Sequence, residues 1–202
     1  MLLPYRTQPY ILHMSVAFYL LLLIGHWGLF DVLYFHIYKC KLDSRPECQR
    51  EVFWHTLRHL IYALQFIIIA NFRFHGAALS LLAVIYAADI FVAWADVLEE
   101  TESRRAQGGL PRGEYFSHIA LTLFAGVYFV CVAQTVWADR LLPTAIVIDP
   151  PPVPVLLRVY MIIMGFGAFG AFCFDLYRWL TFHRKTAAQT RQQMPVNLSN
   201  RF

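Results

Sequence analysis

The sequence is poor in charge and in paired cysteines. Asp, Glu, Lys and Arg make up 15% of its 202 residues, against roughly a quarter in a soluble domain. Its four cysteines form neither a CxxC pair nor a paired zinc spacing. The chain also has no P-loop, dinucleotide-binding glycine motif, serine-hydrolase elbow or HExxH motif. These absences exclude the enzyme classes that depend on those motifs.

Long apolar runs are what the sequence has instead. The chain is 58% hydrophobic, with a mean hydropathy of +0.48. Each run can cross a hydrocarbon core about 30 Å thick. We therefore predict an all-α integral membrane protein with five transmembrane helices, the first four forming an antiparallel bundle of two helical hairpins and the fifth packed alongside. The predicted spans are residues 11–38, 51–72, 77–98, 114–138 and 155–182.

Residues 1–182 are interpreted as one transmembrane domain, and residues 183–202 as a disordered, basic cytoplasmic tail. An odd number of spans places the two termini on opposite sides of the membrane. Of the 17 lysines and arginines, all but Arg6, Arg73, Arg140 and Arg158 lie on the side of the C-terminus. By the positive-inside rule that side is cytoplasmic. We expect a plasma-membrane protein, in a bacterium the inner membrane, with its N-terminus outside.

A charged segment, residues 45–59, leads directly into the apolar part of the second span. Pro46 can occupy the first turn of a helix, where its missing N–H costs nothing. A helix that starts there carries one stripe of titratable and polar side chains into the span: Glu51, His55, Arg58 and Tyr62. Ionisable groups at such a depth are costly unless they are paired or ligated, so they indicate a site.

The same pattern occurs twice. His36 precedes Glu51-x3-His55, and Asp96 precedes Glu114-x3-His118. The topology brings both sets to the cytoplasmic ends of four neighbouring spans. Carboxylates and imidazoles without a thiolate suit a divalent metal, with iron favoured over zinc or manganese. The predicted ligands are His36, Glu51, His55, His59, Asp96, Glu114 and His118.

The metal hypothesis predicts a membrane enzyme that oxidises a lipid-like substrate by hydroxylation or desaturation, with a redox partner. Soluble di-iron carboxylate proteins build similar centres in four-helix bundles, although they use Glu-x2-His where this chain has Glu-x3-His. A zinc hydrolase is the second choice. Asp89 or Glu100 would act as base and Tyr62 would donate a hydrogen bond to the substrate. Haem is disfavoured, because His26 has no partner histidine at equal depth.

Two alternatives remain open at this point. The charged cluster can be a structural ion-pair network in a subunit of a membrane complex, or a proton or ion pathway in a carrier. Partners expected from the sequence are membrane lipids and a partner helix on the small-residue face Gly165–Ala171. Basic residues that flank membrane spans do not form a nucleic-acid surface, so no nucleic-acid partner is expected.

Overall fold

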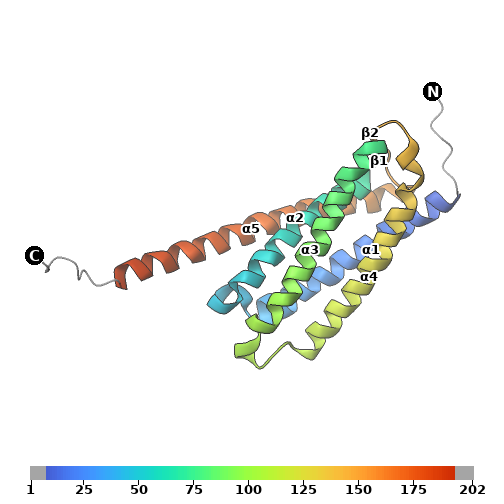
Figure 1. Cartoon of the computed structure of the whole chain (residues 1–202). Coiled ribbons are helices and arrows are strands. Elements are labelled where there is room, and N and C mark those ends of the chain that lie inside the picture. The colour runs from blue at the N-terminus through green and yellow to red at the C-terminus, as the bar shows by residue number, and fades with distance from the viewer. Residues whose placement is uncertain (1–7, 194–202) are drawn as a thin grey trace, which may run out of the picture.

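The computed structural model describes residues 8–193 and, of these, the side chains of residues 10–187. It is built from five long helices and one small antiparallel sheet (Figure 1). The long helices are α1 (Gln8–Asp31), α2 (Gln49–Asn71), α3 (Leu79–Ser103), α4 (Arg112–Val136) and α5 (Val155–Gln193). The remaining elements are a π-helix η1 (Val32–Lys39), the strands β1 (Phe72–His75) and β2 (Ala145–Ile148), and the short 3₁₀ helices η2 (Leu42–Ser44), η3 (Pro46–Cys48), η4 (Gly76–Ala78), η5 (Arg105–Gln107) and η6 (Ala138–Leu141).

Within the described residues, five helical stretches are long and apolar enough to cross a membrane, which confirms the sequence prediction at that level. Proline marks two of their starts, as expected. Pro46 opens η3, which leads into α2, and Pro111 is the N-cap of α4. The stretches are Tyr10–Lys39, Pro46–Asn71, Gly76–Ser103, Arg112–Leu141 and Val155–Ala187.

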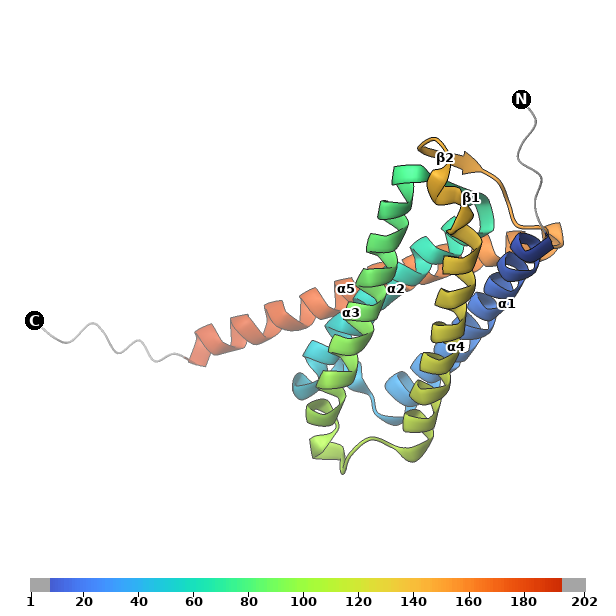
Figure 2. The ribbon, with the colours of Figure 1, turned by 45° about the vertical axis from the view of Figure 1, so that its right-hand side comes forward.

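Helix α2 is at the centre of the packing. It packs against α5 and α3, while α1 packs along α4. This differs from the predicted pairing by consecutive hairpins, because α1 contacts α4 more extensively than α2. In both views of the ribbon the C-terminal part of α5 extends beyond the other four helices (Figures 1 and 2).

The apolar core lies where α1, α2, α4 and α5 meet. Two glycines allow this close approach. A Cβ at Gly25 would lie 2.6 Å from atoms of Phe66 and Met164, and one at Gly165 would lie 2.9 Å from Ile67. Part of the predicted small-residue face of α5 is therefore used inside the molecule. The fully enclosed side chains of the core include Ala17, Phe18, Leu21, Ala70, Tyr128 and Met161.

Strands β1 and β2 form an antiparallel pair at one end of the molecule. In their register, Phe72 lies opposite Ile148. No strand was predicted here, because these residues lie at or beyond the ends of the predicted spans 51–72 and 114–138. Arg73 fixes the sheet: its Nε and Nη2 donate to both carboxylate oxygens of Asp139, at 2.6 and 2.7 Å, and its Nη1 donates to Asp149 at 3.3 Å. The pairing of short β-branched and aromatic segments joins two loops that are far apart in the sequence.

Helix α5 also corrects the predicted tail. It continues to Gln193, so residues 183–193 are helical where a disordered segment was predicted. These residues are rich in Ala, Gln, Arg and Lys, which favour helix, and the next helix-breaking residue is Pro195. Residues 194–202 of the predicted tail lie outside the described residues.

Candidate metal centre

Charged and imidazole side chains gather where η1, α2, α3 and α4 meet, at the end of the molecule opposite the sheet. The predicted convergence is found. His36, His55, Asp96, Glu100, Glu114 and His118 are linked by contacts of 2.8 to 3.2 Å to one another or to Asp31. Asp31 was not among the predicted ligands.

The π-helix brings Asp31 and His36 together. In an α-helix, residues five apart are rotated by about 140° around the axis. In η1, which follows Asp31 directly, the i→i+5 ladder stacks such residues on one face. His36 Nε2 consequently lies 3.4 Å from Asp31 Oδ2. Both side chains are buried.

His118 completes the group from α4. Its Nε2 lies 3.2 Å from the same Asp31 oxygen, and its Nδ1 lies 2.8 Å from Glu100 Oε1. Asp31, His36 and His118 each offer a ligand atom, and these atoms lie within 4.8 Å of one another. Among residues 8–193 no other trio of His, Cys, Asp or Glu meets this criterion.

The spacing of these atoms is that of a coordination shell. Ligand atoms about 2.0 to 2.2 Å from a four-coordinate metal lie about 3.3 to 3.6 Å from one another. The two Asp31–His distances, 3.4 and 3.2 Å, are close to this value. His36 Nε2 also lies 3.2 Å from Glu114 Oε1, yet it makes no hydrogen bond of acceptable geometry within the described structure. A buried nitrogen in this state can be satisfied by a bound water or by a metal ion.

Arg104 occupies the other half of the cluster. Its guanidinium is fully buried, donates to Glu51 Oε2 at 2.5 Å and donates to Glu114. The Ser103 hydroxyl also donates to Glu51. Burial alone would lower the pKa of Arg104, but the two carboxylates raise it above its ordinary value, so the side chain stays charged. Glu51 is thus held by a protein cation and lies outside the trio.

Two other predicted ligands form a branch on α2. His55 Nδ1 and Arg58 Nη1 each lie 3.2 Å from Asp96 Oδ2. His59 Nδ1 lies 3.1 Å from Asp175 of α5. The ring of His55 connects this branch to the trio, with its centroid 4.3 Å from that of His36 and 5.6 Å from that of His59. His55, His59 and Asp96 therefore surround the trio without belonging to it.

The predicted catalytic residues are placed differently from one another. Glu100 contacts His118 directly. Asp89 lies two helical turns, about 10 Å, along α3 from Asp96 and accepts a hydrogen bond of 2.7 Å from Gln65 Nε2. Tyr62 packs under Arg58, with the guanidinium carbon 5.9 Å from the ring centroid. Only Glu100 touches the trio.

Two further side chains limit the chemistry. Burial raises the pKa of the Cys40 thiol, and the neighbouring Glu114, 3.8 Å away, raises it further. Cys40 therefore stays a thiol, which agrees with a site built from nitrogen and oxygen. His26 donates from Nδ1 to Leu22 O and accepts at Nε2 from the Tyr160 hydroxyl, each at 2.7 Å. Both ring nitrogens of His26 are thus engaged within the protein, one of them by a residue of α5.

Arg104 and Asp31 are the members that sequence reasoning missed. Arg104 belongs to a charged linker that looked solvent-exposed, and Asp31 is out of phase with His36 in any α-helical projection. Two glutamates, Glu51 and Glu114, were predicted to lie inside the bundle, and buried carboxylates need a cation as a partner. A search for that cation among nearby residues would have pointed to Arg104. Comparison of the chain with protein-family models, with curated proteins and with solved structures finds no match to any of them.

Proposed function

We propose that this chain is an integral membrane protein that binds one divalent metal ion through Asp31, His36 and His118 near the cytoplasmic ends of its helices. The observation that carries the proposal is the buried trio itself, whose ligand atoms are spaced as around a metal. The excess of basic residues on the side of the cluster supports a position at the inner face of the membrane. A single trio suits one metal ion better than the two of a di-iron centre.

The surroundings of His118 support ligation. A histidine that binds a metal through one ring nitrogen usually donates the other N–H to a carboxylate, which fixes the tautomer and orients the ring. Glu100 stands 2.8 Å from Nδ1 and leaves Nε2 directed at Asp31. In this proposal Glu100 acts as a positioning residue for His118 in place of the general base suggested by the sequence.

Two imidazoles and one carboxylate leave coordination positions open. That donor set is used by catalytic zinc and by non-haem iron in oxygenases. The bound metal would supply Lewis-acid chemistry if zinc and dioxygen chemistry if iron. We favour iron and oxidation of a lipid-like substrate. The neighbouring faces of α3 and α4 support an apolar substrate, because they expose large apolar side chains close to the site: Trp94, Leu98, Tyr115 and Phe116.

Metal content tests the proposal directly. Protein purified in detergent without chelator is measured by elemental analysis and visible spectroscopy, before and after reconstitution with Fe(II) or Zn(II). We expect about one metal ion per chain. Asp31→Asn and His118→Gln should each lower the bound metal at least tenfold while the protein remains monodisperse. Oxygen uptake by the iron-loaded protein in lipid nanodiscs with a reductant then separates oxidation from hydrolysis.

His13→Gln is the matched control. It removes a histidine from the same helix α1, at the opposite end of the molecule. It should leave the metal content unchanged. Equal metal content in all three variants, or no metal after reconstitution, would sink the proposal.

A specific observation favours one alternative, a proton relay without metal. Four imidazoles form a row from α4 through η1 to α2: the centroids of His118 and His36 are 6.2 Å apart, and the row continues through His55 to His59. In vesicles loaded with a pH-sensitive dye, a relay predicts proton flux that His55→Gln abolishes. The metal-centre proposal predicts no such flux.

A further inference from the structure

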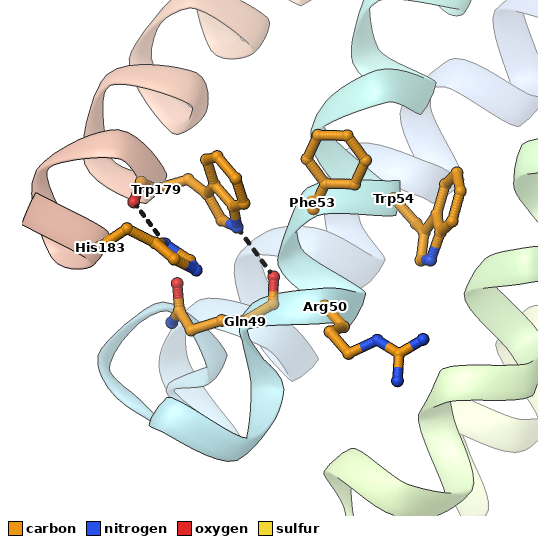
Figure 3. A pocket seen from close by; sticks show the side chains of 6 residues that line it. All are labelled: Gln49, Arg50, Phe53, Trp54, Trp179 and His183. Atoms are coloured by element: carbon orange, nitrogen blue, oxygen red, sulfur yellow. Dashed lines mark hydrogen bonds between the residues drawn. The ribbon is translucent and has the colours of Figure 1, made fainter. Parts of the chain in front are cut away.

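A groove on the outside of α2 and α5 lies at the same end of the molecule as the metal centre but on different residues. It has a volume of about 150 Å³ and is lined by Gln49, Arg50, Phe53, Trp54, Trp179 and His183 (Figure 3). Trp179 and His183 reach into it from α5, and the other four side chains belong to the start of α2.

The walls of this groove are fixed before any ligand arrives. Trp179 Nε1 donates to the backbone oxygen of Gln49 at 3.0 Å, and the Trp179 ring lies 5.2 Å from that of Phe53. His183 Nδ1 donates to the Trp179 carbonyl at 3.0 Å and so holds its ring 4.2 Å from the indole. The polar edge of Trp179 is satisfied, and its contacts with Phe53 and His183 fix an apolar wall of the groove, as in preformed ligand sites.

The groove combines an apolar lining with positive charge at its edge. Arg50 has a side chain that is 81% exposed and is held by one Nη2 contact of 2.9 Å to Glu99. Within the described residues, exposed His183 makes its hydrogen bond through Nδ1, which leaves Nε2 available. Arg184 and Lys185 are exposed directly after it. An anion with an apolar continuation fits this arrangement.

We propose that this groove binds the head end of an anionic phospholipid of the inner leaflet. Its volume is below the roughly 300 to 1,000 Å³ of pockets that enclose a whole small ligand, so it suits a molecule whose tails stay in the bilayer. The phosphate faces Arg50 and His183, and the first carbons of the chains lie on Phe53 and Trp179. Aromatic and basic side chains at this level are typical of lipid contact. The inference rests on membrane insertion, but not on a bound metal.

Native mass spectrometry with added phosphatidylglycerol or phosphatidylcholine tests the charge. The wild-type protein should retain phosphatidylglycerol in preference to phosphatidylcholine. Arg50→Gln should reduce that preference about fivefold, the effect of one basic side chain near anionic lipid. Glu99→Gln, which releases Arg50 from its partner, should increase it. Arg112→Gln removes another exposed arginine, at the start of α4, and should leave the preference unchanged. Equal losses for Arg50→Gln and Arg112→Gln would overturn the site in favour of diffuse surface charge.

Brominated lipids test the position. Bromine quenches nearby tryptophan fluorescence, so brominated phosphatidylglycerol should quench more strongly than brominated phosphatidylcholine. Trp179→Phe should remove this excess, whereas Trp137→Phe, at the far end of α4, should preserve it. Equal quenching by both lipids contradicts the groove proposal alone. Quenching by neither lipid contradicts membrane insertion itself.

Discussion

The buried carboxylates at the two ends of the molecule, the sheet end and the end with the Asp31, His36 and His118 trio, are paired to different extents. At the sheet end, Arg73 engages both oxygens of Asp139 and also reaches Asp149. At the metal-centre end, Asp31, Glu51 and Asp96 each keep one buried oxygen without a hydrogen-bond partner in the described structure. Acceptors of this kind can take a bound water or a ligand, whereas both carboxylate oxygens of Asp139 are engaged by Arg73. The two ends thus differ in how completely their buried carboxylates are paired.

Arg104→Gln should give the largest effect. It removes the cation that neutralises Glu51 and Glu114, and breaking a buried charge network from one side costs about 3 to 5 kcal/mol. Thermal unfolding in detergent, followed by tryptophan fluorescence, should show a strongly lowered midpoint. Arg105→Gln, next to it but 74% exposed in its side chain, is the control and should unfold like the wild type.

Because Arg104 stays charged, its contribution to the free energy of unfolding should not change with pH over a wide range. Because its carboxylate partners raise its pKa above the ordinary value, its contribution is complete below the unfolded pKa and is lost only as pH rises beyond it. The stability difference between the wild type and Arg104→Gln should therefore be constant from about pH 7 to pH 10. A difference that shrinks within this window would contradict a permanently charged guanidinium.

Arg73→Gln should destabilise the protein less, by about 2 to 3 kcal/mol for the loss of charge-assisted hydrogen bonds. Its effect should also differ in kind. Metal content should be unchanged, since Arg73 lies at the sheet end. Loss of bound metal in Arg73→Gln would show that the two ends are coupled, and the comparison between them would then fail.

Glu100→Gln should leave the fold intact and weaken metal binding by about 10- to 100-fold, as for other carboxylates that orient a ligating histidine. Titration with a chelator of known affinity measures this change. Glu102→Gln, a nearby exposed carboxylate of α3 paired with Arg105, is the matched control. Unchanged affinity in Glu100→Gln would show that His118 does not use its contact with Glu100 to bind metal.

Arg50→Gln should have the smallest effect on stability, within about 0.5 kcal/mol, because its ion pair with Glu99 is largely exposed. Unfolding midpoints of the wild type and the variant should coincide within that range in lipid-free detergent. A large loss would mean that Arg50 is structural, and its effect on lipid binding would then need to be measured in Glu99→Gln instead.

Much of the fold follows from local properties of the sequence. Apolar runs predicted five helices of spanning length, and Pro46 and Pro111 marked two of their starts. The sheet was not predicted, because Phe72–His75 and Ala145–Ile148 are short and pair across about 70 residues of intervening chain. The continuation of α5 to Gln193 was missed, because polarity was taken as disorder although the residues favour helix.

The sequence predicted where the site lies in the fold, but not which residues form the trio. Helix phase and topology brought His36, His55, Asp96, Glu114 and His118 to one end, and the structure places them there. Which of them form the trio depends on side-chain geometry across four helices. Asp31 belongs to the trio because the backbone changes from α-helix to π-helix directly after it. Glu51 lies outside the trio because it is paired with the buried Arg104.

The change from α-helix to π-helix after Asp31 means that the site depends on the number of residues between Asp31 and His36 as well as on their side chains. Removing a single residue between Asp31 and His36 would let η1 relax to an ordinary α-helix, with every side chain of the site still present in the sequence. The remaining four-residue separation would still bring the two side chains to one face, because residues four apart in an α-helix lie only about 40° from alignment around the axis. The end of the first helix thus carries one residue more than an α-helix needs to join this pair, and the deletion tests whether the π-helical geometry, and not the side chains alone, sets the position of His36.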